Sequence, residues 1–435
     1  MPTVSLTTLG CKLNSAETSS LGKEFLTRGY RLVEFGTPAD IAVINTCSVT
    51  ERADRECRQL IRRARRASPD GVLIVTGCYA QLNPDRLAEM KEVDYVFGAK
   101  EKSSLFSLIG PLERALYPRV FVSPIDQVDN FGPAASTDAA DRTRAFLKVQ
   151  DGCDYRCSFC TIPLARGASR SQSIDACTDQ ARTLIARGYR EIVLTGVNVG
   201  DYGSKDGNSL LDLLGTLVRV EGLDRLRISS IEPNLLTDAI IDFVASEPVM
   251  CRHFHIPLQS GSDDILRRMR RRYTAAQYAE RIHAVQERIP ECGIGVDVIT
   301  GFPGETDAHF AETIAFLQNL PVSYLHVFTY SERPHTPAAS FGSPVPPAVR
   351  RRRTTRLRLV GMKKRRAFHE GLVDSTVQVL FESSNETGLR RGFTGTYARV
   401  AVPADATGAN SVVNVFITGA DDEQCTGRVV QEVEA

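Results

Sequence analysis

Short apolar runs alternate with helical patterns over the first quarter of the chain. After the first strand pattern, Leu21, Phe25 and Leu26 lie on one face of a predicted helix, and Asn14 with Glu17 has the spacing of a helix capping box. Continuous apolar strands that alternate with helices are typical of a parallel sheet covered on both faces, so residues 1–122 are predicted to form an open parallel α/β domain. The three strand patterns are the alternating residues 4–8 and the apolar runs 41–44 and 72–75.

A longer alternation of strand and helix patterns occupies residues 140–368 and predicts six β/α units. A complete barrel of this type has eight units. Six units therefore predict a partial (β/α)6 barrel with an open side, which suits a large substrate. The predicted strands are residues 145–149, 191–195, 225–230, 253–258, 294–299 and 324–329.

Two further segments complete the predicted α/β multidomain architecture. Residues 123–139 are rich in Pro, Ala, Ser and Asp and have little apolar periodicity, so they are predicted to be a linker. Residues 369–435 contain short strand patterns separated by turn residues, which predicts a small antiparallel β-barrel. Barrels of this size are used for RNA contacts, although a stabilising cap has the same pattern.

Composition narrows the classes of function. The 435-residue chain is 42% hydrophobic and 24% charged, with a net charge of +1, which is ordinary for a globular protein. It contains no apolar run of about 18 residues, so no membrane span is expected. The first residues lack the basic and apolar regions of a signal peptide, so we expect a cytoplasmic location. Eleven cysteines in such a chain favour metal binding or catalysis over disulfides.

Basic residues are concentrated in three stretches, although the net charge is close to zero. A solvated helix face would explain any one of the three. Together they favour contact with a polyanion such as RNA. The stretches are residues 52–66, 267–272 and 350–366.

Cys153, Cys157 and Cys160 stand in a C-x3-C-x2-C spacing just after the first strand of the partial barrel. Active sites of such barrels lie at this end of the strands. Three thiolates on one loop can bind three irons of a [4Fe–4S] cube, which leaves one iron open for chemistry. The alternatives are a structural zinc site or three free cysteines. Zinc sites commonly use two separated pairs of ligands, and no second pair follows here.

Cys11, Cys47 and Cys78 each follow the C-terminal end of a predicted strand in the first domain. These ends line one edge of an open α/β sheet, so we expect the three cysteines to converge. A helix begins after each one, and the helix N-terminus stabilises thiolates. The pattern predicts a second cluster with three protein ligands and one open iron. Any one of the three could instead be a small buried apolar residue.

Polar residues and glycines also follow the other strands of the predicted barrel. Glycine lets the backbone approach a ligand closely, and hydroxyl, carboxylate and amide groups can bind a ribose, an adenine edge or an ammonium group. Each could equally be a turn residue or a helix cap. The candidates are Thr195, Gly196, Ser230, Glu232 and Gln259.

The cysteine motifs resemble those of the radical S-adenosylmethionine (SAM) methylthiotransferases. The resemblance covers almost the whole chain and includes a looser likeness of the C-terminal segment to a TRAM domain. Two local variants, at Lys12-Leu13 and Val49-Thr50, resemble the branch that acts on N6-threonylcarbamoyladenosine at tRNA position 37. The matching motifs are Gly10-Cys11, Asn45-Thr46-Cys47, Gly77-Cys78 and the Cys153/Cys157/Cys160 loop.

This resemblance implies a reaction and its cofactors. The Cys153/Cys157/Cys160 cluster would bind and cleave SAM, and the resulting radical would abstract hydrogen from C2 of the modified adenine. The second [4Fe–4S] cluster, on Cys11, Cys47 and Cys78, would deliver sulfur, and a second SAM would supply the methyl group. A C2–H bond has no useful acidity, so a radical rather than an acid or base must activate it.

The resemblance also implies SAM contacts and partners. By analogy, Phe159 would lie near the adenine of SAM, Thr195-Gly196 near its ammonium group, and Ser230 and Glu232 near its ribose or carboxylate. The implied partners are a tRNA whose base 37 is splayed out of the anticodon loop, a reductant such as flavodoxin or ferredoxin, and a sulfur source.

Three alternatives remain open at this point. The same chemistry could act on isopentenyladenosine in tRNA or on an aspartate of a ribosomal protein. The chain could be a radical SAM enzyme with another reaction and structural N-terminal cysteines. It could also be a non-catalytic iron–sulfur or zinc protein that binds RNA.

Overall fold

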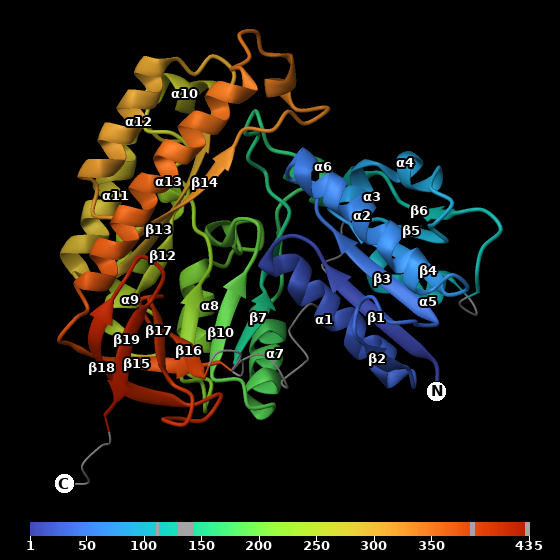
Figure 1. Ribbon diagram of the computed structural model, residues 1–435, viewed down its shortest axis with the longest axis horizontal. Coiled ribbons are helices and arrows are strands. Elements are labelled where there is room, and N and C mark those ends of the chain that lie inside the picture. The colour runs from blue at the N-terminus through green and yellow to red at the C-terminus, as the bar shows by residue number, and fades with distance from the viewer. Residues whose placement is uncertain (110–112, 129–131, 133–142, 383–387, 431–435) are drawn as a thin grey trace.

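Three structural units follow one another along the chain in the computed structural model (Figure 1). They are an N-terminal parallel sheet, a central partial barrel and a C-terminal closed barrel, so the predicted fold class is confirmed. The structure describes residues 1–109, 113–128, 132, 143–382 and 388–430. Residues 129–131 and 133–139 of the predicted linker lie outside the described residues, and the domain boundaries stay predictions.

The N-terminal sheet is parallel throughout, with strand order β2-β1-β3-β4-β5-β6. β3 and β4 are buried along their whole length, which explains their unbroken apolar runs. The sequence pattern missed β2, β5 and β6 because each has only three residues. The strands are β1 Thr3–Thr8, β2 Arg31–Val33, β3 Ile41–Thr46, β4 Val72–Gly77, β5 Tyr95–Phe97 and β6 Arg119–Phe121.

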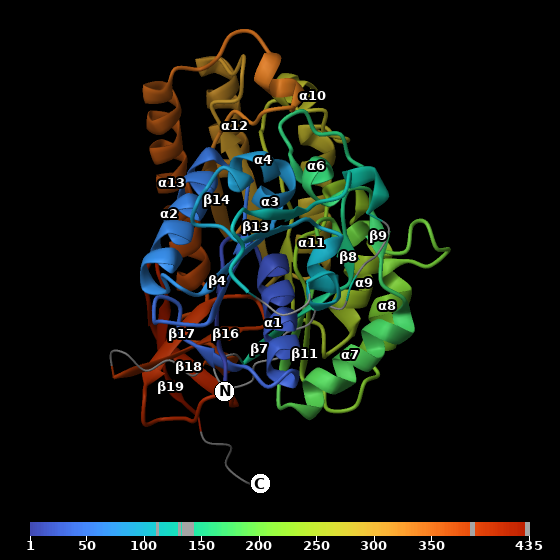
Figure 2. The same ribbon diagram turned by 90° about the vertical axis from the view of Figure 1, so that its right-hand side faces the viewer.

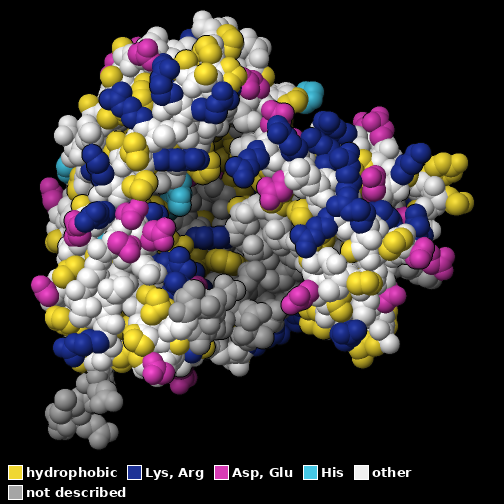
Figure 3. All heavy atoms as spheres, in the orientation of Figure 1, with side chains coloured by type: hydrophobic (Ala, Val, Ile, Leu, Met, Phe, Trp, Pro, Cys, Tyr) yellow, Lys and Arg dark blue, Asp and Glu magenta, His cyan; other side chains and the backbone are white. Residues whose placement is uncertain are grey.

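Helices flank this sheet and begin where its central strands end (Figure 1). In α2, Cys57, Ile61 and Ala64 are buried against β3 and β4. Most of its arginines are exposed, so basic side chains gather over this helix in Figure 3. The predicted capping box of α1 is wrong, because Cys11 is the N-cap and the side chains of Asn14 and Glu17 are buried. The helices are α1 Lys12–Thr27, α2 Glu51–Ala67, α3 Cys78–Leu82, α4 Pro84–Ala88 and α5 Leu105–Leu108.

The partial barrel has the six parallel strands that the sequence predicts. They form two three-stranded sheets, β11-β10-β7 and β12-β13-β14, which are joined by the parallel bridges Leu226–Met250 and Ser230–His255. The strands are β7 Arg144–Lys148, β10 Glu191–Thr195, β11 Arg225–Ile228, β12 His253–His255, β13 Gly293–Thr300 and β14 Tyr324–Thr329.

Helices cover the outside of this barrel, and the largest apolar core of the chain lies between them and the strands. The open side of the barrel faces the N-terminal sheet, with α1 next to β7 (Figures 1 and 2). The helices are α7 Ile174–Ala186, α8 Leu210–Leu217, α9 Asp238–Ser246, α10 Asp263–Arg268, α11 Ala275–Arg288, α12 Asp307–Asn319 and α13 Pro347–Glu370.

The C-terminal strands close into a five-stranded barrel in the order β15-β16-β17-β19-β18. Four strand pairs are antiparallel, as predicted, whereas β17 and β19 pair in parallel. Arg225 and Arg227 attach this barrel to β11, because their guanidinium groups donate to the carbonyls of Phe393 and Gly395 at 2.9 Å. The strands are β15 Thr376–Phe381, β16 Leu389–Thr394, β17 Arg399–Pro403, β18 Val412–Ala420 and β19 Cys425–Val429.

The described part of the chain contains no candidate for a transmembrane helix. Within that part, none of the helices combines the length and the apolar character needed to cross a bilayer.

Candidate functional site

The Cys153/Cys157/Cys160 loop and a one-turn helix after it connect the two strands of a short hairpin, and the sequence pattern predicted neither the hairpin nor the helix. The hairpin pairs β8 (Gln150–Asp151) with β9 (Arg170–Ser171), and the helix is α6 (Ile162–Arg166). Gly152 has φ +68°, and a Cβ atom there would lie 2.0 Å from the Ala168 carbonyl oxygen. The loop can therefore begin only at a glycine, because the chain passes so close to the second strand of the hairpin.

Hydrogen-bond donors point at all three sulfur atoms of this loop. The backbone amides of Tyr155 and Ile162 lie 3.4 Å from Cys153 Sγ and Cys160 Sγ, and the Arg271 guanidinium lies 3.2 Å from Cys157 Sγ. Such donors stabilise the thiolate form that binds iron. The donor set thus fits an iron–sulfur cluster.

Burial works against thiolates in this loop when no iron is bound. It raises the pKa of Cys153 to about 11 and that of Cys160 to about 12, and the neighbouring cysteines add repulsion between thiolates. Metal ligands must be deprotonated to bind, so iron binding here would release protons.

Arg271 is a site residue that sequence reasoning missed, because it was grouped with the basic stretch 267–272. Its side chain is only 3% exposed and pairs with Glu232 while it contacts Cys157 Sγ. Its Nε donates to Tyr273 Oη at 2.9 Å, and that tyrosine donates to the carbonyl oxygens of Pro257 and Leu258. Arg271 therefore connects the cysteine loop with the polar end of β11. No local pattern distinguishes it from the exposed arginines beside it.

Cys11, Cys47 and Cys78 follow β1, β3 and β4, which are adjacent strands of one sheet. The three strand ends approach closely. A Cβ atom at Gly10 would lie 3.3 Å from Cys47 Sγ, and one at Gly77 would lie 2.4 Å from the Thr46 carbonyl oxygen. Both glycines have positive φ, +126° and +97°, so the residue before each of these two cysteines must be glycine.

The three strand-end thiols also influence one another electrostatically. Burial raises the pKa of Cys47 to about 12, and repulsion from Cys78 and Cys11 contributes to that shift. Burial likewise raises the pKa of Cys78. Among the described residues, no three His, Cys, Asp or Glu side chains stand at the spacing of a single-metal-ion site. The role of the six cysteines as cluster ligands stays a prediction.

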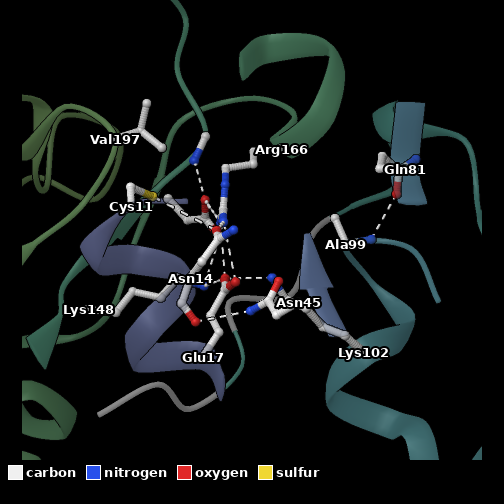
Figure 4. Close-up of polar contacts among 12 residues, drawn as sticks. Cys11, Asn14, Glu17, Asn45, Gln81, Ala99, Lys102, Lys148, Arg166 and Val197 are labelled. Atoms are coloured by element: carbon white, nitrogen blue, oxygen red, sulfur yellow. Dashed lines mark hydrogen bonds and ion pairs between the residues drawn. The ribbon is translucent and has the colours of Figure 1, made fainter. Parts of the chain in front are cut away.

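A buried polar network joins the two cysteine sites (Figure 4). At its centre Arg166, on α6, donates to Glu17 Oε1 and Asp151 Oδ1 at 3.0 Å each and to Asn14 Oδ1 at 2.6 Å. Asn14 in turn donates to the carbonyls of Leu9 and Thr46, at the ends of β1 and β3. The network therefore fixes the cysteine loop of the barrel to the cysteine-bearing end of the sheet.

Two lysines complete this network around Glu17. Lys102 Nζ lies 2.5 Å from Glu17 Oε1, and Lys148 Nζ lies 2.7 Å from Asp151 Oδ2. Burial alone would raise the pKa of Glu17, but the charges of Arg166, Lys102 and Lys148 outweigh it and hold that pKa well below its ordinary value. Loss of one partner from such a buried network leaves an uncompensated charge and is strongly destabilising.

The residues predicted to contact SAM lie on strand ends around the cysteine loop. Gly196 lies against Gln150, whose Oε1 accepts from the amides of Val197 and Asn198 at 2.9 Å each. Thr195 is buried at the end of β10, and its hydroxyl donates to the Val193 carbonyl. Their contacts with SAM stay predictions.

Three further predicted residues lie at the ends of β11 and β12. Ser230 Oγ is 3.2 Å from His255 Nδ1, and His255 Nε2 is 3.0 Å from Asp297 Oδ1. Burial raises the pKa of Glu232, although Arg271 opposes the shift. Gln259 has φ +69°, an uncommon conformation for a residue other than glycine, and it pairs with β13.

One pocket of about 190 Å³ lies between the Cys160 end of the loop and the segment that follows Cys47. Val49 and Thr50, just after Cys47, form one wall, and Phe159 and Cys160 form another. Phe159 packs edge-to-face on Phe302, with ring centroids 6.5 Å apart. The remaining lining residues are Thr161, Ile162, Gln259, Asp297, Ile299, Phe328, Thr329, Tyr330 and Ser331.

Two protein families match parts of the chain. The radical SAM superfamily matches residues 147–317, which span the cysteine loop and most of the partial barrel. Uncharacterized protein family UPF0004 matches residues 3–98, which contain Cys11, Cys47 and Cys78.

Relatives match over most or all of the chain. The threonylcarbamoyladenosine tRNA methylthiotransferase MtaB of Bacillus subtilis (strain 168) is 38% identical over 100% of this chain and 98% of its own. The protein of the same name from Aquifex aeolicus (strain VF5) is 40% identical over 84% of this chain and 90% of its own. The chain belongs to the radical SAM tRNA methylthiotransferase family. This methylthiotransferase is also 34% identical to the tRNA-2-methylthio-N(6)-dimethylallyladenosine synthase of Sorangium cellulosum (strain So ce56), over 99% of this chain and 90% of that protein.

Membership of this family confirms the predicted enzyme class and the radical SAM core with its iron–sulfur and SAM chemistry. The fold agrees with a solved structure of the radical SAM methyltransferase TsrM from Kitasatospora setae. The match covers 78% of this methylthiotransferase and 77% of the TsrM chain, with a TM-score of 0.60 and 17% sequence identity. Because the identity is so low, this likeness bears on the fold alone.

Proposed function

We propose that this methylthiotransferase converts N6-threonylcarbamoyladenosine at tRNA position 37 into its 2-methylthio derivative. The observation that carries the proposal is the pocket between the loop site and the segment after Cys47. Its lining includes Cys160 from the loop and Val49 and Thr50 from that segment. Radical formation and sulfur delivery can therefore meet at one bound base. The names of the Bacillus subtilis and Aquifex aeolicus relatives support the threonylcarbamoyl substrate.

Six cysteines would hold the cofactors in this proposal. Cys153, Cys157 and Cys160 would bind the cluster that receives SAM, and Cys11, Cys47 and Cys78 would bind the second cluster. When bound, these groups would supply a radical and a sulfur atom, chemistry that cofactors rather than unmodified side chains carry. The chain itself binds and orients the reactants and excludes water.

Other side chains would hold SAM and tune the cysteine loop. Phe159 and Gln259 line the pocket beside Cys160, where an adenine could pack. Glu232 and Ser230, on the end of β11, offer oxygens for ribose or ammonium groups, and Thr195-Gly196 offers backbone close to the loop. The guanidinium of Arg271 keeps positive charge beside Cys157 Sγ.

tRNA would contact basic surfaces near the mouth of this pocket. α2 begins directly after Thr50 and carries exposed arginines on its outer face (Figure 3). A tRNA substrate agrees with a cytoplasmic location. A small electron carrier such as flavodoxin or ferredoxin would supply the electron, and a separate sulfur source would renew the sulfur that each turnover consumes. The exposed arginines of α2 are Arg52, Arg55, Arg62, Arg63 and Arg66.

The second candidate is the same reaction on dimethylallyladenosine (isopentenyladenosine) at position 37. The 34% identity to the Sorangium cellulosum synthase favours it. A ribosomal-protein aspartate has no support among these relatives. The two tRNA substrates differ in charge, because the threonylcarbamoyl group carries a carboxylate and the dimethylallyl group is apolar.

Mass spectrometry of tRNA nucleosides tests the proposal. Cells that lack this gene should lose 2-methylthio-N6-threonylcarbamoyladenosine and keep its unmethylthiolated precursor, and a plasmid copy should restore the product. The dimethylallyl derivative in the same sample is the internal control. An unchanged level of the threonylcarbamoyl product would refute the proposal, and loss of the dimethylallyl product alone would establish the second candidate.

A further inference from the structure

A row of rings lies on the inner face of β14. Leu325 packs against Gly361 of α13 and Val327 is buried in the core, so the alternate residues Tyr324, His326 and Phe328 face the barrel interior. His326 is exposed and Phe328 is 46% exposed, although both lie on this inner face. The interior is therefore open to solvent along the row, in agreement with the hollow between the two halves of the molecule in Figure 3.

The row runs from the pocket beside Cys160 toward the C-terminal barrel. Phe328 lines that pocket, and the His326 ring lies 5.3 Å from Tyr324. Tyr324 lies 6.2 Å from Tyr397, which the C-terminal barrel contributes. Aromatic faces at such spacings are the surfaces on which splayed-out RNA bases stack.

A lysine from the N-terminal domain ends this row. Lys12 Nζ lies 5.7 Å from the centroid of the Tyr397 ring. Arg144 and Arg227 also lie over that ring, but each is paired with a carboxylate, Glu382 at 2.8 Å and Glu191 at 2.7 Å. No hydrogen bond or ion pair joins Lys12 to another residue in the described ranges. An unpaired charge in a largely enclosed site is costly, and an anionic ligand would offset that cost.

The two ends of the row differ in charge. Asp297 lines the pocket at the Cys160 end, and its Oδ1 lies 3.0 Å from His255 Nε2, whereas the other end carries the unpaired cation of Lys12. A base with a neutral edge and an anionic substituent would therefore bind in one orientation. Its ring would lie near the pocket, and its anionic group would point away from Asp297.

We propose that Lys12 is a specificity-determining residue that binds the carboxylate of the threonylcarbamoyl group, while the Tyr324/His326/Phe328 row holds the adenine. This inference rests on the proposed function. It explains how the enzyme would prefer a base with a carboxylate to one with an apolar dimethylallyl group. The compact cation of Lys12 would bind the carboxylate, whereas an apolar group would leave that cation desolvated and without a partner.

Binding to anticodon stem-loops tests the inference without requiring turnover. The probes carry threonylcarbamoyladenosine, its neutral methyl ester or dimethylallyladenosine at position 37, and the protein is the reconstituted holoenzyme. Wild type should bind the carboxylate about tenfold more tightly than the ester. Lys12→Met should bind carboxylate and ester equally, and Lys12→Arg should retain most of the preference. Lys23→Met, at an exposed position of the same helix, α1, is the matched lysine control and should behave as wild type.

Two outcomes would overturn the inference. One is equal binding of carboxylate and ester by wild type, which needs no variant and so does not depend on how Lys12→Met folds. The other is an unchanged preference in Lys12→Met. Turnover separates these failures from failure of the proposed function. If wild type does not methylthiolate the threonylcarbamoyl stem-loop, the proposed function fails. If wild type does so and the ester binds equally well, only the role of Lys12 fails.

Discussion

The two cysteine sites offer the same three thiols but are built in different ways. In the loop site, Cys153, Cys157 and Cys160 lie on one short segment, and hydrogen bonds from two backbone amides and Arg271 reach their sulfurs. In the strand-end site, the cysteines come from three neighbouring strands and meet only because the sheet forms. Local chain geometry therefore fixes the first site, and the tertiary fold fixes the second.

This difference determines which substitutions should disrupt each site. The loop site depends on a few contacts within and beside residues 150–171. The strand-end site depends on close packing at Gly10 and Gly77 and on the Arg166 network that attaches the sheet to the barrel. Changes in the loop should abolish SAM cleavage, whereas changes in the network should loosen the relation between the two sites.

The largest effect is expected from Cys157→Ala in the loop site. Loss of one of three predicted ligands should remove the cluster that receives SAM and lower the rate of 5′-deoxyadenosine formation by about 10³-fold or more. Anaerobic assays with dithionite and SAM measure this rate. Cys177→Ala is the matched control, because Cys177 is fully buried in the core of the barrel. Normal SAM cleavage by Cys157→Ala would contradict the assignment of the loop.

Arg166→Ala should have the next largest effect, on stability. It leaves Glu17 and Asp151 buried with fewer partners, which should lower the free energy of unfolding by about 3–5 kcal/mol. Urea unfolding of the iron-free protein measures the change. Arg182→Ala is the control, because Arg182 and its partner Asp179 are exposed, and it should unfold as wild type does. A similar curve for both variants would show that the network does not hold the two sites together.

Arg271→Lys should have a moderate effect that is confined to the loop site. A lysine cannot contact Cys157 Sγ and Glu232 in the forked geometry of arginine, so SAM cleavage should slow by about tenfold while the iron content stays unchanged. Arg267→Lys, at an exposed arginine that pairs with Asp264, should have no effect. An unchanged rate in Arg271→Lys would mean that Arg271 is a structural residue only.

The smallest effect is expected from Cys57→Ala, which tests whether Cys57 belongs to the ligands of the strand-end site. Cys57 is buried on α2, and its Sγ lies 3.3 Å from the Cys47 carbonyl oxygen, so it is near the site without belonging to the predicted ligand set. The variant should lose about 1 kcal/mol of stability. Its iron content and product yield should equal those of wild type. Loss of iron would add Cys57 to the ligands.

Sequence patterns predicted the units of the fold and missed particular elements. Five of the six barrel strands have four to eight residues, and the three residues of β12 continue into a buried run to Leu258, so a pattern can detect all six. β2, β5 and β6 have three residues each and were not detected. The strand-end cysteines could be predicted to converge because parallel strands place their C-terminal ends at one edge.

Charged residues were harder to interpret from sequence. Arg350 and Arg353 belong to the basic stretch 350–366, yet both are buried, and Arg353 pairs with Glu305 at 2.6 Å. Arg271 pairs with Glu232 in the same way. A run of arginines does not reveal which of them meets a distant carboxylate, because the partner is set by tertiary packing. For the same reason the Asn14–Glu17 spacing was mistaken for a helix cap.

The division of labour between the two cysteine sites can be tested in one variant, Cys47→Ala. The measurement counts 5′-deoxyadenosine and 2-methylthio product in the same anaerobic reaction, together with iron per chain. If this division holds, SAM cleavage continues within about threefold of wild type, methylthio product is absent, and iron falls from about eight to about four per chain. Methylthio product at the wild-type yield, or unchanged iron, would contradict it.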